Sequence, residues 1–327
     1  MTVSLHASAT TVATGGTASA ETSRQLPVTT RELERVAAAV LHAAQRGGAT
    51  AAETDVSQGV GQSVTVRNDE VETISYNRDK SIGITVYVGQ RRGNSSTADF
   101  SDDAIAAAVD KAIAIARYTA DDPASGLADP ALLARDWPDL DLHHPWHLAV
   151  DDAIALGRET EAAARAVDAR ITNSEGATVA CGESEFVYAN SLGFAGGYRT
   201  SRHHIDCAVI ADAGDTMQRD FWYSAARAAA DLAPSAAIGR MAGERAVRRL
   251  GARQLGTLDC PVVFEAPEAA DLISFFVQAV SGGSLYRKSS FLQDSIGQAV
   301  FAPHVQLRED PHLRRGRGSA PFDSEGV

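Results

Sequence analysis

Short runs that alternate between apolar and polar side chains fill residues 53–98, and this period of two constrains the fold more than any other feature. The runs read SVTVR, VETISYN, SIGITVYV and RRGNSSTA. Turn-forming residues separate them at Asn68-Asp69, at 77–80 and at Gly89-Gln90. Such alternation is typical of strands with one buried face, and short turns between runs join antiparallel neighbours. We therefore expect an antiparallel meander over this stretch.

Two helices are expected to flank the meander. Thr29 and Glu32 fit a capping box at the start of the first helix, and the glycines at 47–48 end it. The second helix begins at 101–102 and ends near Tyr118. The side chains that form one apolar face of the first helix are Leu33, Val36, Val40 and Ala44.

Helical and strand patterns follow one another again after residue 120. Residues 121–149 are rich in Pro and Asp and show little periodicity, so we expect a linker that crosses the surface. A helix at 150–166, a strand-rich block at 171–223 and a helix at 235–250 follow, and turns are expected at 174–176, 191–193 and 196–197. A short strand at 261–264 then leads into a helix at 267–280.

These patterns predict an α+β protein without a visible internal repeat. The expected sections are an unstructured tail at 1–28, an N-terminal α/β domain of helix plus meander at 29–120, the linker at 121–149, a strand-rich central domain at 150–252 and the start of a β-rich C-terminal domain at 253–327. The sequence stops at SAPFDSEGV without a terminal helix. We therefore expect the C-terminal domain to be truncated and its sheet to be incomplete.

Composition excludes several classes of protein. The net charge of −12 and the pI near 5.2 argue against direct binding to nucleic acid, and the basic run at 314–317 is too short for a DNA footprint. Three scattered cysteines indicate a reduced, intracellular protein. No apolar stretch reaches the roughly 20 residues of a membrane span, and the first 28 residues lack the pattern of a secretion signal. We expect a cytoplasmic protein with no membrane contact.

A candidate contact segment lies at 273–297, which reads ISFFVQAVSGGSLYRKSSFLQDSIG. An apolar helix breaks at a double glycine, and a basic and hydroxyl-bearing cluster follows that could hold a carboxylate or a peptide backbone. Two plainer interpretations stay open: the glycines form an ordinary helix C-cap, and the basic side chains lie over the domain surface. The candidate residues are Gly282, Gly283, Tyr286, Arg287, Lys288 and Ser289.

The sequence contains no recognised metal-binding motif. No His-Glu dipeptide occurs, which excludes HExxH and HExxxH motifs. The sequence HHPWH, from His143 to His147, is the best remaining cluster, and a solvated loop is the favoured interpretation of it. His203 and His204 lie in a strand pattern, so their rings point to opposite faces.

No sequence motif indicates nucleophilic or acid–base catalysis either. There is no G-x-S-x-G elbow, and the three cysteines have no visible base partner. Acidic pairs such as Glu183 with Glu185, and Asp323 with Glu325, are interpreted as solvated faces or turn residues. The sequence therefore predicts no catalytic residue in this chain.

Six segments, taken in order, resemble the TldD/PmbA family of bacterial metallopeptidase-complex proteins, and specifically its PmbA branch, also called TldE. In the TldD branch the helix at this place carries an HExxxH zinc motif, whereas Ile273, Ser274 and Gln278 occupy those places here. A one-residue shift in the alignment would put Ser274, Phe275 and Ala279 there, and neither set contains a zinc ligand. The segments are VRNDEVE (66–72), GITVYV (83–88), IARYTADDP (115–123), ITNSEG (171–176), SGGSLYRKSSFLQDSIG (281–297) and PFDSEGV (321–327).

The resemblance implies the metal-free subunit of a cytosolic peptidase heterodimer that degrades or processes peptides. A TldD-like partner would supply HExxxH and the zinc, and this chain would bind no cofactor and help to form the substrate cavity. Family members are also described as modulators of DNA gyrase, an effect that would have to be indirect for so acidic a chain. Two alternatives stay open: a non-proteolytic regulatory protein of gyrase-inhibitor or toxin–antitoxin systems, and a metallopeptidase in its own right.

Overall fold

The computed structural model describes residues 26–214 and 216–327, and the chain divides into two compact units. The main unit comprises Met1–Gly251 together with Asp310–Val327, and the small unit comprises Ala252–Glu309. The predicted section 29–120 and all but the last residue of the section 150–252 thus fall in one unit, together with the end of the predicted C-terminal section. No described helix has the length and apolar character needed to cross a membrane.

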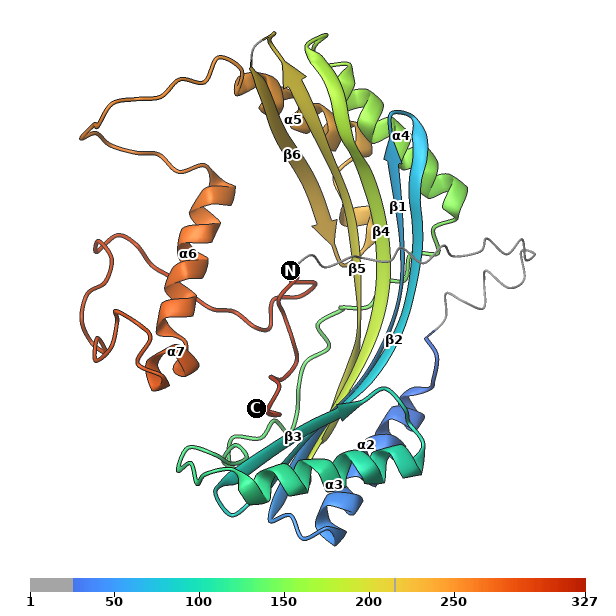
Figure 1. Ribbon diagram of the computed structural model, residues 1–327, viewed down its shortest axis with the longest axis vertical. Helices are drawn as coiled ribbons and strands as arrows, with labels where there is room; N and C mark the ends of the chain where they lie inside the picture. Colours follow the sequence, from blue (N-terminus) through green and yellow to red (C-terminus); the bar gives the residue numbers. More distant parts are fainter. Residues whose placement is uncertain (1–25, 215) are drawn as a thin grey trace, which may run out of the picture. The chain divides into compact units, whose positions relative to one another are not determined.

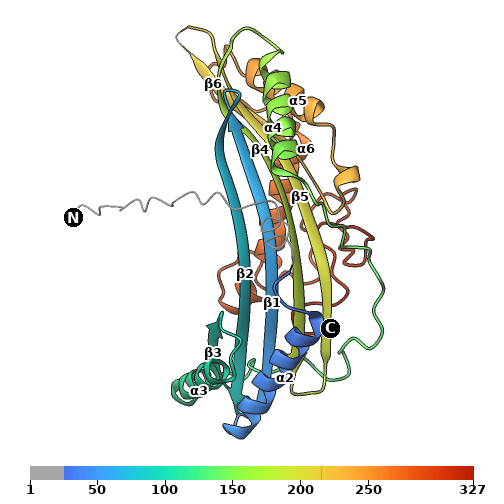
Figure 2. The same ribbon diagram turned by 90° about the vertical axis from the view of Figure 1, so that its right-hand side faces the viewer.

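The core of the main unit is a six-stranded sheet in the order β3-β2-β1-β4-β5-β6, in which every neighbouring pair is antiparallel. This confirms the α+β class and the antiparallel meander. Long strands curve together along the unit (Figures 1 and 2). The strands are β1 (Ala51–Arg67), β2 (Glu70–Val88), β3 (Arg91–Thr97), β4 (Ile171–Asn190), β5 (Ala195–Asp212) and β6 (Met217–Ala226).

Two halves of the main unit have the same order of elements. The first runs α2, β1, β2, β3, α3 and the second runs α4, β4, β5, β6, α5, and they meet where β1 pairs with β4. The two halves therefore share an arrangement of elements that the sequence does not show as a visible repeat. The helices are α2 (Thr30–Arg46), α3 (Asp102–Tyr118), α4 (Val150–Arg165) and α5 (Ser235–Arg248), and a short 3-10 helix η1 (Ala229–Asp231) precedes α5.

The four helices cover two ends of one sheet face, which we call the helix face. Even-numbered side chains of β1 are buried all along the strand. Of these, Val56 packs into the core under α2 and α3, and Val64 packs into the core near α4 and α5. The two helix pairs lie at opposite ends of the strands (Figure 1). Between them, Gln58 and Gln62 face the same side, so a polar band separates two apolar cores.

Most predicted helix and turn positions are confirmed. Thr29 caps α2 by accepting a hydrogen bond from the Glu32 amide, at 3.3 Å. Asn68 and Asp69 form the β1–β2 turn with φ values of 53° and 65°, as a tight hairpin requires. Gly89 lies in the β2–β3 turn with φ 64°.

Three predicted turns are instead parts of strands. Residues 77–80 lie inside β2, where continuous pairing with β1 holds polar residues in an exposed strand. Residues 174–176 form a bulge in β4, with Gly176 at φ 104°. Gly196 lies in β5, and its missing side chain leaves room for Phe322, which a Cβ would approach to 2.9 Å. Composition indicated turns at these places because it cannot show the distant strand or side chain that decides the local conformation.

The predicted linker and tail are partly built into the main unit. Leu140, Leu142 and Leu148 of the linker are buried, so this stretch is not a free surface crossing. Residues 1–25 of the predicted tail lie outside the described residues, but Val28 forms two hydrogen bonds with Gln58.

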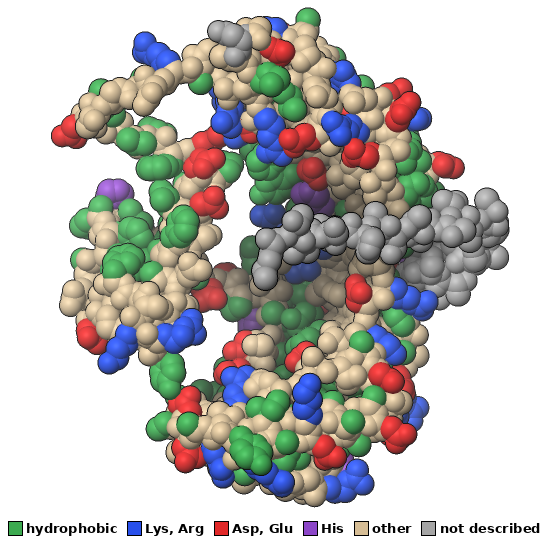
Figure 3. All heavy atoms as spheres, in the orientation of Figure 1, with side chains coloured by type: hydrophobic (Ala, Val, Ile, Leu, Met, Phe, Trp, Pro, Cys, Tyr) green, Lys and Arg blue, Asp and Glu red, His purple; other side chains and the backbone are tan. Residues whose placement is uncertain are grey.

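The small unit contains α6 (Ala266–Val280) and α7 (Gly282–Tyr286). The predicted helix at 267–280 is confirmed, whereas residues 261–264 are irregular and not a strand. Many apolar side chains of this unit are exposed, including Val263, Phe275 and Ile296. Figure 3 shows hydrophobic side chains on its surface. The predicted β-rich character is therefore not seen in residues 252–309.

Candidate functional site

The predicted contact segment forms a helix–break–helix in the small unit. Ser281 separates α6 from α7 with φ −61° and ψ 139°, and its side chain accepts a hydrogen bond from the Ser284 amide. The break therefore comes one residue before the double glycine, and Gly282 and Gly283 open α7 instead of capping α6. A Cβ at Gly283 would lie 3.3 Å from a guanidinium nitrogen of Arg287. Gly283 thus leaves room for the Arg287 side chain above it.

The basic cluster follows directly at the end of α7. Arg287 is the C-cap residue, and Lys288 adopts φ 54°. Ser289 closes the turn, because its amide and its hydroxyl both donate to the Ser284 carbonyl, at 2.9 Å and 3.2 Å. The side chains of Tyr286, Arg287 and Lys288 are exposed. The structure thus presents two cations side by side on a defined turn, and their predicted role in contact stays a prediction.

The residues that the resemblance aligns with the zinc motif of the TldD branch lie along α6. Ile273 is half-buried, and Ser274 and Gln278 are exposed. The Ser274 hydroxyl donates to the carbonyl of Ala270 at 3.0 Å, one turn earlier in the same helix. An alkyl side chain, a hydroxyl used within the helix and a neutral amide do not make the His-rich ligand set that zinc prefers. Throughout the described part of the chain, no three His, Cys, Asp or Glu side chains gather where they could hold a metal ion.

The histidines of the HHPWH stretch bind different carboxylates. His143 Nε2 lies 2.9 Å from Glu183, and His144 Nε2 lies 3.1 Å from Asp141. Both imidazoles are half-buried, so the expectation of a solvated loop was wrong. Arg315 also contacts Asp141 at 2.6 Å, and this hydrogen bond holds the pKa of the Asp141 carboxyl below its usual range. His143 therefore fastens the former linker to β4, whereas the His144 contact lies within the linker itself.

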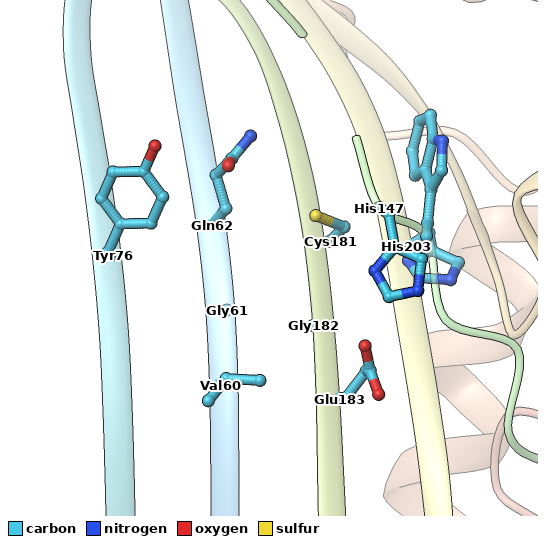
Figure 4. Close-up of a pocket in the computed structure, with 10 residues that line it drawn as sticks. Val60, Gly61, Gln62, Tyr76, His147, Cys181, Gly182, Glu183 and His203 are labelled. Atoms are coloured by element: carbon cyan, nitrogen blue, oxygen red, sulfur yellow. The ribbon is translucent and has the colours of Figure 1, made fainter. Parts of the chain in front are cut away.

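A hollow of about 390 Å³, including its open mouth, lies on the helix face between the two helix pairs. Figure 4 shows side chains from four neighbouring strands and from the crossing loop around it. Its lining is largely apolar, with a few polar groups, as is typical of small-molecule pockets. The lining residues are Val60, Gly61, Gln62, Tyr76, Trp146, His147, Cys181, Gly182, Glu183 and His203.

His203 is the buried ionisable group of this hollow. Its Nε2 lies 2.8 Å from the carbonyl oxygen of His144, which only accepts, so Nε2 carries the proton. Trp146 packs edge-on against the ring, with centroids 5.4 Å apart. Burial lowers the pKa of His203, so the ring is neutral and Nδ1 is an acceptor. Neither His203 Nδ1 nor Oε1 of Gln62, which lies two strands away beyond Cys181, has a hydrogen-bond partner within the described structure.

A buried carboxylate beside the hollow anchors the first residue of α2. Glu185 is only 2% exposed and accepts hydrogen bonds from Thr30 and from Gln58 Nε2, the latter at 2.8 Å. Arg199 lies 3.2 Å from the same carboxylate. The earlier interpretation of Glu183 and Glu185 as solvated was therefore wrong, because Glu183 binds His143 and Glu185 holds Thr30.

The S-x-P-F-D-x-E-G motif at 319–326 packs on the opposite face of the sheet. Phe322 is 3% exposed and meets Phe194 and Tyr198 edge-on, at centroid distances of 5.1 Å and 5.5 Å. Gly326 accepts a hydrogen bond from the amide of Ala134, at 2.8 Å. Arg227 donates to the carbonyl of Arg317 at 2.7 Å. The motif is thus a structural anchor for the end of the chain.

Sequence reasoning missed the mid-sheet residues because their partners are far away in the chain. Gln58 and Glu185 are separated by 127 residues, and Thr30 and Glu185 by 155. The one available signal was the even-numbered alternation of β1, which places Gln58 and Gln62 on its buried side. A polar residue at a buried strand position predicts a partner, although it does not name one.

Profiles of three domains of one family match this chain in order. They are described as PmbA/TldA metallopeptidase domain 1 at residues 52–116, central domain at 143–250 and C-terminal domain at 257–327. Metalloprotease PmbA of Escherichia coli O157:H7 is 43% identical over 281 residues, which are 86% of this chain and 62% of that protein. The chain belongs to the PmbA/TldD family. A PmbA homologue of Haemophilus influenzae is 41% identical over 91% of this chain and 66% of its own length. The chain thus spans about two thirds of these PmbA relatives.

Solved structures show the same fold. A protein of Bacteroides thetaiotaomicron, described as a candidate modulator of DNA gyrase, superposes with a TM-score of 0.85 at 25% identity, over 92% of this chain and 69% of its own. TldE of Thermococcus kodakarensis superposes with a TM-score of 0.60 at 17% identity, over 79% of this chain and 58% of its own. The second likeness supports the PmbA/TldD fold alone.

Proposed function

We propose that this chain is the PmbA/TldE-type subunit of a cytosolic zinc peptidase heterodimer and that it does not itself carry the zinc. The observation that carries the proposal is the composition of α6 in a PmbA/TldD family member. Ile273, Ser274 and Gln278 occupy the places where the TldD branch has its HExxxH motif. None of these side chains is a zinc ligand of the usual kind. The catalytic residues would then lie on a TldD-type partner.

In such a complex the partner's zinc would supply the activated water, and this chain would hold the peptide. Arg287 offers a planar pair of donors that fits a carboxylate, and Lys288 adds a second positive charge. Both residues lie within the turn that Ser289 closes, so the backbone that carries them has a defined conformation. We propose that they contact the carboxylate end of a peptide substrate or an acidic surface of the partner.

The proposal is tested by co-expressing this chain with a TldD-type chain that carries HExxxH. We expect a heterodimer that contains one zinc per pair and cleaves unstructured peptides, whereas this chain alone binds no stoichiometric zinc and cleaves nothing. Sizing, metal analysis and a peptide-cleavage assay measure these outcomes. Tightly bound zinc in the isolated chain, or cleavage by it, would show that it is a peptidase in its own right.

The contact role is tested by reversing both charges in the variant Arg287→Glu/Lys288→Glu. Repulsion of a carboxylate should reduce peptide turnover or heterodimer assembly by about tenfold, since a charge-assisted hydrogen bond contributes about 1.5–3 kcal/mol. The single variant Arg308→Glu, in the same unit and also exposed, is the control for changed surface charge. Turnover and assembly equal to the unmodified chain would show that the two cations are ordinary surface residues.

A non-proteolytic regulatory role is the second candidate. It is favoured by the likeness to the Bacteroides thetaiotaomicron protein described as a candidate modulator of DNA gyrase. Acidic and basic side chains are interspersed on the face in Figure 3, and the net charge of −12 disfavours direct contact with DNA. Recovery of target proteins from a lysate that lacks any TldD-type chain would support this role over the first.

A further inference from the structure

A single row of side chains crosses the strands on the floor of the hollow between the two helix pairs. Gln62 of β1 pairs with Tyr76 of β2 on one side and with Cys181 of β4 on the other. Cys181 pairs in turn with His203 of β5. Residues directly opposite one another in antiparallel strands project to the same face, so all four side chains line the hollow (Figure 4). The hollow therefore has one end over β1 and β2 and another over β5.

Each end of the hollow holds a buried acceptor atom that no described residue satisfies. At one end, Gln62 donates through Nε2 to the carbonyl of Leu148, at 3.4 Å, and because that carbonyl only accepts, Oε1 is the atom left over. At the other end, His203 donates through Nε2 to the carbonyl of His144, at 2.8 Å, and Nδ1 is left over. Gln62 is 5% exposed and His203 is fully buried. Because an unsatisfied buried acceptor costs free energy, a ligand with a donor at each end is favoured here.

The surroundings of the two acceptors favour a positively charged ligand. Glu183 lines the hollow, although it also contacts His143 at 2.9 Å, and none of the ten described lining residues is Lys or Arg. An aromatic ring lies at each end, Tyr76 over β2 and Trp146 against His203. Aromatic faces attract ammonium groups. Burial lowers the pKa of His203, so the imidazole is neutral and does not repel a cation.

We propose that the hollow binds a small aliphatic diamine, with one ammonium group donating to Gln62 Oε1 and the other to His203 Nδ1. These two residues are separated by two strand spacings, or about 10 Å between their Cα atoms. The carbon chain of the diamine then lies over Cys181, a small and weakly polar side chain. A monoamine satisfies only one of the two acceptors, and a diamine with two carbons is too short to reach both.

A comparison of ligands on the unmodified chain tests the two-ended geometry. Isothermal titration calorimetry should give a Kd for cadaverine, a five-carbon diamine, about tenfold below that for pentylamine, which has the same carbon chain and a single amine. Ethylenediamine carries both charges on a shorter chain, so it controls for unspecific attraction to a chain of net charge −12 and should also bind about tenfold more weakly. Equal affinity for the three amines, or no binding of cadaverine at millimolar concentration, would overturn the proposal.

The variant Gln62→Leu locates the binding in the hollow. It removes the acceptor at one end, so cadaverine should bind about tenfold more weakly, whereas pentylamine can still use the His203 end and should change little. Gln45→Leu, at an exposed glutamine of α2 outside the hollow, is the matched control. Equal cadaverine affinity in the two variants would count decisively against this site.

Nitrogen NMR of isotopically labelled histidine gives a readout that needs no variant to fold. A hydrogen bond from the ammonium group should shift the Nδ1 resonance of His203, because this atom changes from an unsatisfied to a satisfied acceptor. An unchanged resonance at saturating cadaverine would place the diamine elsewhere and refute the proposal. The inference does not depend on the peptidase role and stands if that role fails.

Discussion

The two halves of the main unit share one order of elements but are built from different contacts. In the first half, α2 and α3 rest on the sheet through large aliphatic side chains such as Leu33, Val36 and Ile105. In the second half, α4 and α5 approach each other so closely that a Cβ at Gly239 would overlap the carbonyl oxygen of Thr160. The first half has its close backbone approach elsewhere, between β3 and α3, where a Cβ at Gly93 would overlap the carbonyl oxygen of Ala112. Similar topology is thus reached with a close strand–helix contact in one half and a close helix–helix contact in the other. This difference explains why the repeat leaves no trace in the residue pattern.

The largest expected effect comes from filling the close helix contact of the second half. Gly239→Ala should lower the free energy of unfolding by about 3 kcal/mol, because the added methyl meets backbone that cannot move aside. Urea unfolding followed by circular dichroism measures the change. The control is Gly157→Ala on α4, where the new methyl would meet a movable Val66 methyl at 3.0 Å. That variant should lower the free energy of unfolding by less than about 1 kcal/mol, because Ala has a higher helix propensity than Gly and offsets part of the crowding. Equal effects at the two glycines would show that the close approach of α4 and α5 does not decide the stability of this half.

The second prediction concerns a hydrogen-bonded contact between the two halves. Glu161 of α4 is 2% exposed and accepts hydrogen bonds from the amides of Asn68 and Asp69, both at 2.9 Å. It therefore fixes the β1–β2 turn of the first half. Glu161→Ala should lower the free energy of unfolding by about 1.5 kcal/mol and speed hydrogen exchange at the two turn amides, because hydrogen bonds to a charged group are lost.

The control for this contact is Glu175→Ala, which removes an exposed carboxylate paired with Arg219. Such surface pairs contribute about 0–1 kcal/mol, so a small change is expected. Unchanged exchange at Asn68 and Asp69 in Glu161→Ala would mean that the turn holds itself through its own backbone geometry.

The sequence predicted the elements well and the site poorly, for one physical reason. Helix caps and alternating runs are local, so Thr29, the turn at Asn68 and the limits of most helices could be inferred directly. The turns predicted at 77–80 and 196–197 failed because a partner strand and Phe322, both distant in the chain, decide the conformation there. The prediction that Glu185 is solvated failed for the same reason, because its burial depends on the distant residues Thr30 and Gln58.

The smallest expected effect is a pH dependence that comes from a buried histidine of the second half. Burial lowers the pKa of His203 below its value in the unfolded chain, so the unfolded chain binds the proton first as pH falls. Stability is therefore complete above the unfolded value of about 6.5 and is lost below it, by at most about 1.4 kcal/mol per pH unit. The nearby charges act in opposite directions, because Glu183 raises the pKa of His203 and His144 lowers it.

His203→Gln tests this dependence, because its amide can still donate to the His144 carbonyl without gaining a proton. Unfolding free energies measured at pH 7.5 and pH 5.5 should fall less in this variant than in the unmodified chain, by about 1 kcal/mol. His42→Gln, on the exposed surface of α2, should leave the dependence unchanged. An identical loss in the unmodified chain and in His203→Gln would assign the pH dependence to the exposed carboxylates of both halves. The buried imidazole would then be only a packing element, and the two halves would differ in their contacts but not in their electrostatics.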